Sequence, residues 1–407
     1  MLVALGDPAR GIAVLPWLAL ALVALTDWTL SRPRGLGAQL TVAPELFVGE
    51  DVPLTLSVTG VPQGAEARLD WPDGLRGPGV VSVTGADTQI TAQAARRGLW
   101  PLDRLWLCWP SRLGLFQVVP QLPLDIELRV VPNIRLVQSG EISVTVQSAL
   151  HGVKENRMVG DGSEFHQLRD FTPGMDVKTI DWKRSAKRRS LVAKELRAER
   201  NHHVIIALDN GYLMGQQVAG LPRIDHAVTA GLALAWAAAV GGDRVGYFAY
   251  DVQPRLFLKP EPGRAAFAAI RARTAELDYV GRETNHTLAL TELSARTPKR
   301  SLIVIFTEFV DTTSAELLVE NIRLLSKRHL VVFVALRDAG VDALVDQAPQ
   351  DLDGVAAVVA AHQVASERRL VFEQLARIGV TVIDARPGQV TAQLIATYLD
   401  IKARDLL

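Results

Sequence analysis

The sequence predicts a doubly wound, Rossmann-like α/β domain at the C-terminus, preceded by a small all-β sandwich and an N-terminal transmembrane helix. From residue 201 onward, continuous apolar runs such as 203–208 and 330–336 alternate with helical stretches. This alternation is typical of a mostly parallel sheet flanked by helices. Residues 38–133 hold short runs separated by Pro- and Gly-bearing turns, which favours a sandwich. Residues 11–30 are apolar over about the length that crosses a bilayer core.

Composition sets the limits of this interpretation. The chain has 407 residues, 48% apolar and 22% charged, which is typical of a globular protein with a large core. Its formal net charge is +0, so we expect no nucleic-acid partner. We predict a membrane anchor over residues 1–36, a β-sandwich domain over 37–135, a signature segment with a basic linker over 136–200, and the α/β domain over 201–407.

The N-terminal apolar segment is the candidate for a membrane anchor. Trp17 and Trp28 suit the two membrane interfaces, and Asp27 lies near one end, where a charge costs less. The flanking arginines are Arg10 on one side and Arg32 and Arg34 on the other. This bias favours a membrane protein, single-pass or truncated two-pass, whose later domains are cytoplasmic. A secretory signal peptide and a buried core helix are the alternatives.

The β-rich segment shows no arrangement for catalysis. It contains no histidine, and its Cys108 is the single cysteine of the chain, so no intrachain disulfide forms. A lone thiol fits a reducing compartment. We interpret Trp100, Trp106 and Trp109 as packing residues, with a ligand-binding role as the alternative.

Residues 134–200 are polar and punctuated by Gly, Pro and Asp. The basic residues that gather toward the end of this segment are Lys183, Arg184, Lys187, Arg188, Arg189, Lys194, Arg197 and Arg200. A solvated surface with internal ion pairs is one interpretation, and a site for an acidic protein surface is another. Binding of phosphate, lipid headgroups or nucleic acid is a third. The run lacks the interleaved aromatic residues of a single-strand binding groove.

The first strand of the predicted α/β domain ends at Asp209, at the edge where such sheets bind ligands. This position resembles the metal-ion-dependent adhesion site of von Willebrand factor A domains. There, the pattern Asp-x-Ser-x-Ser and a later Thr and Asp hold a divalent cation, because Mg²⁺ prefers oxygen ligands. Here Gly211 and Leu213 occupy the two serine positions, and neither side chain has an oxygen.

The other candidate ligands lie on later loops. Thr284 or Thr287 could supply a hydroxyl, and Glu308 stands where the later Asp is expected, with Asp311 nearby. Because two hydroxyl ligands are missing, we expect a structural role for Asp209 and no bound cofactor. Mg²⁺ at Asp209 is the alternative. A metal-dependent hydrolase centred on Asp209, Glu308 and Asp311 is the enzymatic alternative.

A second motif precedes this strand. It reads Gly160-x-Gly162-x-Glu164-Phe165-x-x-Leu168-Arg169-x-Phe171-x-Pro173-Gly174-x-Asp176, then Ile180-Asp181-Trp182-x-x-Ser185-Ala186. The motif resembles the signature of the bacterial domain-of-unknown-function family 58, as do the upstream run Arg97-Gly98-x-x-Pro101-Leu102 and the order of parts. The resemblance implies a von Willebrand A-like C-terminal domain and, from gene context, a MoxR-type AAA+ ATPase as partner. Family members often have a pair of N-terminal helices, whereas this chain has room for one.

The signature residues that we assign to binding are Glu164, Phe165, Arg169, Pro173, Gly174, Asp176, Asp181 and Trp182. Glu164 could pair with Arg169, or Asp176 with Arg184. One interpretation is a clamp between the β domain and the α/β domain. The other is a docking surface near Asp209, formed by Arg169, Asp181, Trp182 and the basic run, because Trp and Arg dominate interface energetics.

Enzymatic motifs are missing from the sequence, which has no P-loop, no Gly-x-Gly-x-x-Gly after a strand and no Gly-x-Ser-x-Gly elbow. His202 and His203 are adjacent in a strand and therefore point to opposite faces. We predict a membrane-anchored protein-binding scaffold or assembly factor that works with a MoxR-type AAA+ ATPase, and not an enzyme. A lipid- or phosphate-binding envelope protein is a further alternative.

Overall fold

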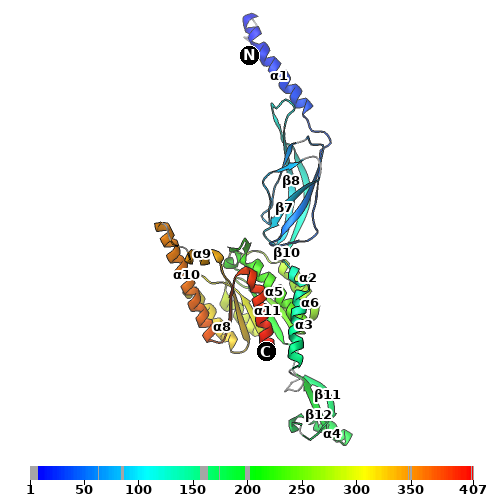
Figure 1. Cartoon of the computed structure of the whole chain (residues 1–407), viewed down its shortest axis with the longest axis vertical. Coiled ribbons are helices and arrows are strands. Elements are labelled where there is room, and N and C mark those ends of the chain that lie inside the picture. Colours follow the sequence, from blue (N-terminus) through cyan, green and yellow to red (C-terminus); the bar gives the residue numbers. More distant parts are fainter. Residues whose placement is uncertain are drawn as a thin grey trace. The chain divides into compact units, whose positions relative to one another are not determined.

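The computed structural model describes residues 8–62, 64–83, 87–155, 164–173, 175–197, 202–346, 348, 351–404 and 406. The chain divides into two compact units, Met1–Pro132 and Asn133–Leu407. Figure 1 labels the elements of both units along the chain. The predicted residues Gly160, Gly162, Gly174 and Arg200 lie outside the described residues.

The first unit begins with helix α1 (Pro8–Leu30), which contains Pro16. Among the described residues, no helix combines the length and apolarity that crossing a membrane demands, so the predicted transmembrane helix is wrong. The predicted membrane location depended on that helix and is corrected with it. Trp17 is 71% exposed, whereas the Asp27 carboxylate is buried. Ser111 donates a 2.6 Å hydrogen bond to this carboxylate and the Leu113 N–H a 3.0 Å bond, which ties the end of α1 to the β-rich part of the unit.

The β-rich part forms sheets of order β1-β3-β7-β5 and β2-β10-β8-β4-β6, with β9 pairing β8. Its strands are β1 (Gly37–Thr41), β2 (Leu46–Phe47), β3 (Asp51–Thr59), β4 (Ala65–Leu69), β5 (Leu75–Arg76), β6 (Val81–Val83), β7 (Thr88–Ala94), β8 (Gly98–Pro110), β9 (Gln117–Val118) and β10 (Gln121–Val131). Residues in these strands alternate between buried and exposed, as in β4, where Ala65, Ala67 and Leu69 are buried. Each sheet therefore has one apolar face and one polar face.

The second unit starts with α2 (Arg135–Gln138) and α3 (Glu141–Glu155). Trp236 donates a 3.0 Å hydrogen bond to Ser143, which joins α3 to helix α5 of the same unit. A hairpin follows, in which β11 (Glu164–Asp170) pairs antiparallel with β12 (Val192–Arg197). The 3₁₀ turn η2 (Val177–Thr179) and α4 (Trp182–Arg188) lie between these strands in the chain.

The main sheet of this unit has the order β17-β16-β13-β18-β19-β20. Its strands are β13 (His203–Asp209), β16 (Arg244–Tyr250), β17 (Pro254–Pro262), β18 (Leu302–Phe306), β19 (Leu330–Leu336) and β20 (Thr381–Ala385). The helices are α5 (Arg223–Val240), α6 (Gly263–Ala275), α7 (His286–Arg296), α8 (Thr312–Ser326), α9 (Ala339–Val345), α10 (Leu352–Arg377) and α11 (Pro387–Ala403). The turn η3 (Tyr212–Gly215) and the short strands β14 (Gln217–Val218) and β15 (Leu221–Pro222) separate β13 from α5.

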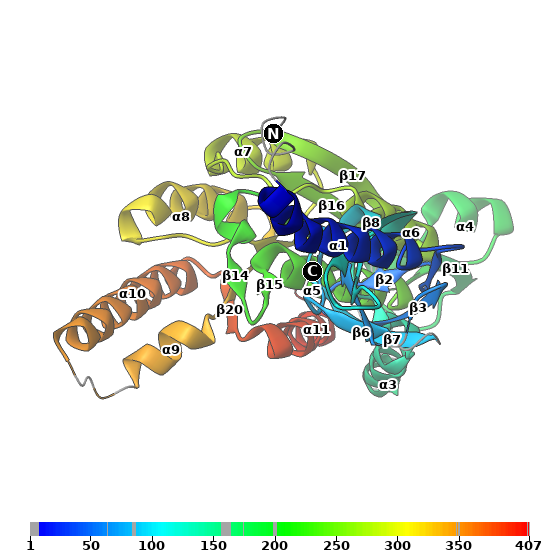
Figure 2. The same ribbon diagram turned by 90° about the horizontal axis from the view of Figure 1, so that it is seen from above.

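Helices cover both faces of this sheet because its strands are apolar on both sides. Ile205 lies in a buried cluster with Leu290 of α7, Leu318 of α8 and Val371 of α10. On the opposite face α5 packs so closely that a Cβ added to Gly231 would lie 3.2 Å from Ile206. Figure 2 shows α8 and α10 side by side, in agreement with their packing in this cluster.

The predicted fold class is wrong as stated, because the sheets are mixed. Strand β17 pairs antiparallel with β16, whereas the other strand pairs of the main sheet are parallel. Strand β17 was not predicted, because its prolines and charges do not form an apolar run. A tight turn at Asp251 and Gln253 returns the chain directly from β16, and so short a connection permits only antiparallel pairing.

Candidate functional site

The candidate site lies at the carboxyl ends of β13 and β18, which are neighbours in the main sheet. After β13 the chain passes to β16 on one side, and it later returns to place β18 on the other side. Ligands of α/β sheets bind at the strand ends beside such a reversal of strand order. Asp209 ends β13, and Thr307 and Glu308 follow β18 directly.

Asp209 is buried and is surrounded by hydrogen-bond donors. Its Oδ1 accepts a 2.8 Å bond from the Gly211 N–H and a 2.6 Å bond from the Thr284 hydroxyl. Its Oδ2 accepts a 2.6 Å bond from the Thr307 hydroxyl. The carboxylate therefore holds together the ends of β13 and β18 and the loop before α7.

The residues present do not fit a divalent cation of the adhesion-site type. Gly211 and Leu213 offer no side-chain oxygen, and Leu213 lies in the 3₁₀ turn η3. A Cβ at position 211 would lie 1.9 Å from the Thr284 hydroxyl oxygen and 3.2 Å from Oδ1 of Asp209. The Thr284 hydroxyl thus occupies the space that a serine side chain at position 211 would need.

Two aromatic side chains adjoin the Asp209 cluster. The rings of Tyr250 and His286 pack edge to face with their centroids 6.0 Å apart. Burial, and then the negative charge of Asp209, raises the pKa of Tyr250 well above its ordinary value. Burial lowers the pKa of His286, although Asp209 and Glu283 oppose this shift. Both side chains are therefore neutral at pH 7.

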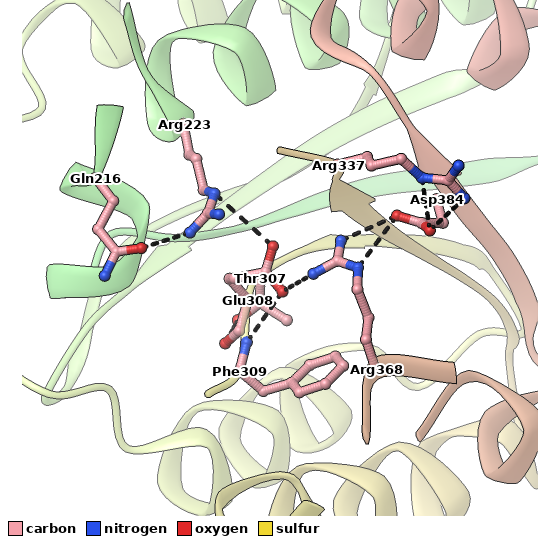
Figure 3. A network of polar contacts seen from close by, with 8 residues as sticks. All are labelled: Gln216, Arg223, Thr307, Glu308, Phe309, Arg337, Arg368 and Asp384. Carbon is pink, nitrogen blue, oxygen red and sulfur yellow. Dashed lines mark hydrogen bonds and ion pairs between the residues drawn. The ribbon is translucent and has the colours of Figure 1, made fainter. Parts of the chain in front are cut away.

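Glu308 belongs to a different network, which Figure 3 shows. Its carboxylate is buried and accepts a 2.6 Å hydrogen bond from Nη1 of Arg368, on α10. Arg223, at the start of α5, places its Nε 3.9 Å from the other carboxylate oxygen. Nη1 of Arg223 donates a 2.6 Å bond to Gln216. The network therefore connects α5 and α10 to the end of β18.

The network continues to the end of β20. Arg368 also donates through Nη2 to Oδ1 of Asp384 at 3.0 Å, and Arg337 donates through its Nη2 to Oδ2 of Asp384 at 2.8 Å. Arg223, Arg337 and Arg368 together outnumber the carboxylates of Glu308 and Asp384. The predicted placement of Glu308 as a ligand beside Asp209 does not agree with these contacts, since its partners are guanidinium groups.

The other predicted loop residues have separate roles. The main-chain carbonyl of Asp311 accepts a 3.1 Å hydrogen bond from the Ala315 N–H at the start of α8. The hydroxyl of Thr287 accepts a 3.0 Å bond from Asn321, also on α8. Of the alternatives for the later hydroxyl, the structure therefore brings Thr284 to Asp209.

The signature residues lie in the β11–β12 hairpin and its connecting turns. Asp176 caps η2 by accepting a 2.9 Å hydrogen bond from the Lys178 N–H, and Asp181 caps α4 by accepting a 3.1 Å bond from the Arg184 N–H. Asp181 also lies 3.7 Å from the Lys194 ammonium. Hydrogen bonding of Asp181 to Arg184, stronger than the opposing effect of desolvation, lowers the pKa of Asp181.

The remaining signature residues are exposed or lie outside the residues that the structure describes. Trp182 is 65% exposed at the start of α4. Arg169 is exposed on β11, and Pro173 is exposed in the loop that follows. Glu164 and Phe165 begin β11, and their side chains lie outside the described residues, as does all of Gly174. The predicted docking surface near Asp209 and the predicted clamp between domains stay predictions.

The family described as "Protein of unknown function DUF58" matches residues 167–366 of this chain. This match supports the resemblance to family 58 that the sequence shows. No curated protein matches the chain.

Solved structures similar to the chain include a conserved hypothetical protein, BatB, from Bacteroides thetaiotaomicron. It is 16% identical, with 49% of this chain and 99% of that chain covered, at a TM-score of 0.32. Another is proximal thread matrix protein 1 from the mussel byssus, 10% identical over 50% of this chain and 48% of that chain, at a TM-score of 0.31.

Thr307 and the arginines of the network were not predicted from the sequence. Thr307 directly precedes Glu308, and its position at a strand end was the available signal. Arg368 lies 60 residues beyond Glu308, inside an otherwise ordinary helix, and no local pattern marks it. Arg223 was visible only as the first residue of an apolar helix.

Proposed function

We propose that this chain is a protein-binding module and not an enzyme, and that its DUF58 segment binds its partner without a bridging metal ion. The observation that carries the proposal is the set of hydrogen bonds to Asp209. Hydroxyls of Thr284 and Thr307 and the Gly211 N–H donate to the carboxylate, which in an adhesion site would serve a cation. The von Willebrand A-like character that the resemblance implies also supports a binding role.

The hairpin of β11 and β12 supplies the docking surface in this proposal. Trp182 is 65% exposed, Val177 60% and Leu191 48%, so large apolar side chains face solvent. Residues 164–197 carry nine Lys and Arg against five Asp and Glu. Exposed Trp surrounded by positive charge suits an acidic protein surface, because Trp and Arg anchor interfaces and opposite charge steers association.

The partner that we propose is a MoxR-type AAA+ ATPase. This inference depends on the resemblance to family 58, whose members are associated with such ATPases by gene context. Because the hairpin is basic, we expect the ATPase surface that contacts it to be acidic. Increasing salt should therefore weaken the complex, because screening acts on exposed charges over roughly 10 Å at 0.1 M.

The test is co-purification from a native extract followed by mass spectrometry. The full chain should retain the ATPase, and the variant with Arg169→Ala and Trp182→Ala should lose it. A matched control carries Arg377→Ala and Leu317→Ala, which remove an exposed arginine and an exposed apolar residue elsewhere in the unit. Retention of the partner by a folded Arg169→Ala, Trp182→Ala variant would contradict the docking surface.

Calorimetry tests both the proposal that partner binding needs no metal ion and the alternative that the chain is a metal-dependent hydrolase. We expect no heat of binding when Mg²⁺ or Mn²⁺ is titrated to millimolar concentration into the full chain. Glu308, which a hydrolase would need beside Asp209, already accepts its 2.6 Å hydrogen bond from Arg368. Saturable binding of either metal that Asp209→Asn abolishes would contradict the proposal.

A further inference from the structure

The outer face of the β-rich part of the first unit holds a cavity of about 470 Å³. Its lining includes Trp106, Arg68, Arg104, Glu66 and Asp70. Ligand sites typically measure about 300–1,000 Å³, so the cavity has room for a small molecule or for one or two rings of a polymer. The proposed protein-binding function does not involve this cavity.

Strand register places these side chains together. Arg68 on β4 pairs with Trp106 on β8, and Glu66 pairs with Cys108. Arg104 lies two residues before Trp106 on the same strand and therefore points to the same face. The residues between them, such as Leu105 and Leu107, are buried in the core. Regular, paired strands thus place Glu66, Arg68, Arg104 and Trp106, whereas Asp70 directly follows β4.

Trp106 is the aromatic side chain in the cavity lining. In the part of the chain that the structure describes, Trp71 donates a 3.0 Å hydrogen bond to the Pro78 carbonyl and Trp100 a 3.1 Å bond to the Arg96 carbonyl. The half-buried Trp106 has no such bond among the described residues. A partly exposed indole without a partner offers a flat apolar surface and a free N–H donor.

The charges around Trp106 limit the classes of ligand that this cavity can bind. Arg68 and Arg104 donate hydrogen bonds, whereas Glu66 and Asp70 accept them, and their formal charges cancel. A simple anion would meet the two carboxylates, and an apolar ligand would remove charged groups from water without replacing their hydrogen bonds. The ligand should combine a flat apolar face with groups that both donate and accept.

We infer that this cavity is a saccharide-binding site, with Trp106 as the platform for a neutral sugar ring. The C–H face of a pyranose is flat and apolar and stacks on an indole. Each sugar hydroxyl donates to a carboxylate such as Glu66 or Asp70 and accepts from a guanidinium such as Arg68. Val80 and Val119, 56% and 51% exposed, also line the cavity and add apolar contact to the ring.

Isothermal titration calorimetry of the full chain tests this inference. The probes are neutral tetrasaccharides of β1,4-linked glucose, α1,4-linked glucose and β1,4-linked N-acetylglucosamine, with a glucuronic acid oligomer and a glutamate-rich peptide for comparison. We expect at least one neutral tetrasaccharide to bind. Trp106→Ala should weaken that binding about tenfold or more, which corresponds to about 1.4 kcal/mol, a usual contribution of one aromatic stacking contact. Trp106→Phe should keep part of it.

The control is Trp17→Ala, which removes an exposed tryptophan from α1 in the same unit and should leave saccharide binding unchanged. Near-ultraviolet circular dichroism checks that the Trp106→Ala variant keeps its fold. Binding of only the acidic probes, binding of none of the probes, or equal saccharide affinity in wild type and Trp106→Ala would each overturn the inference. None of these outcomes depends on the ATPase, so the proposed function is tested separately.

Discussion

Arg368 donates a 2.6 Å hydrogen bond to the buried carboxylate of Glu308, and this contact fixes helix α10 to the end of β18. The Glu308 side chain is 3% exposed and that of Arg368 is 18% exposed, so water screens the pair only in part. A buried carboxylate without its cation is strongly unfavourable. The position of α10 and the burial of the Glu308 carboxylate therefore depend on each other.

Replacing Arg368 with Met should destabilise the second unit. Met keeps an apolar stem but removes the guanidinium, which leaves the charge of Glu308 without its main partner. We expect the free energy of unfolding to fall by about 3–5 kcal/mol, measured by urea denaturation. Adding Glu308→Gln should restore part of the loss, because the amide carries no charge to bury.

The matched control is Arg369→Met, the next residue on α10, whose side chain is exposed. We expect it to change the free energy of unfolding by no more than about 0.5 kcal/mol. Equal stability of the Arg368→Met and Arg369→Met variants would mean that the pair contributes nothing.

Restoring the first serine of the adhesion-site pattern should damage the site. In Gly211→Ser the new Cβ would lie 1.9 Å from the Thr284 hydroxyl oxygen, so Thr284 must move and give up its bond to Asp209. Overpacking of this kind costs about 1–3 kcal/mol. We expect a lower urea midpoint and no gain in Mg²⁺ affinity.

Gly215→Ser is the control for this substitution, because a Cβ at Gly215 meets nothing within 4 Å. Its stability should match that of wild type. A Gly211→Ser variant that is as stable as Gly215→Ser and binds Mg²⁺ would show that the site accepts a cation after a single change.

The sequence could predict where strands and loops lie along the chain, but not which way their side chains point. The apolar run at residues 330–336 is strand β19, because a strand buried on both faces needs a continuous apolar segment. Asp209 at a strand end and Thr284 in a later loop also come together. The Glu308 carboxylate, in contrast, contacts the guanidinium of Arg368, which lies 60 residues later in the sequence. This positive charge attracts the carboxylate more strongly than the Asp209 cluster does without a metal ion. No local pattern encodes that choice.

The partners of Asp27 could not be predicted from the sequence either. Within residues 11–30, Asp27 is a single charge near the end of an apolar segment. In the structure Asp27 accepts hydrogen bonds from Ser111 and Leu113, far along the chain. A contact between residues so distant in sequence is not visible in local composition.

The attachment of α1 through Asp27 should depend on pH. Burial opposes ionisation of Asp27, but hydrogen bonds from Ser111, Leu113 and Ser31 hold its pKa below the ordinary value of 3.8. A carboxylate with a lowered folded pKa stabilises the fold above the unfolded pKa, and this contribution disappears as pH falls through the folded pKa. We expect faster hydrogen exchange at the Leu113 amide only below about pH 4.

Asp27→Asn should reproduce this loosening at pH 7, because the amide carries no charge to strengthen its hydrogen bonds. Asp103→Asn, at an exposed position on β8, is the control. Unchanged exchange of the Leu113 amide in Asp27→Asn would argue that the carboxylate does not anchor α1.

Buried histidines should make the second unit less stable in mild acid. Burial lowers the pKa of His226, His286 and His329 below the ordinary value of 6.5. The unfolded chain then binds more protons than the folded chain below about pH 6.5, so the free energy of unfolding falls as pH decreases through this range. Urea midpoints measured at pH 7.5 and at pH 5 should show this decrease, which begins at a higher pH than the effect of Asp27.

His329 offers the cleanest test of this dependence. Both of its ring nitrogens are buried without a hydrogen-bond partner among the described residues, so His329→Leu removes a titrating group without breaking such a bond. We expect this variant to lose less stability than wild type between pH 7.5 and pH 5. His362→Leu, at an exposed position on α10, should keep the wild-type slope. If His329→Leu keeps that slope too, its imidazole accepts a proton in the folded chain as readily as in the unfolded one, and burial at this position does not disfavour the charge.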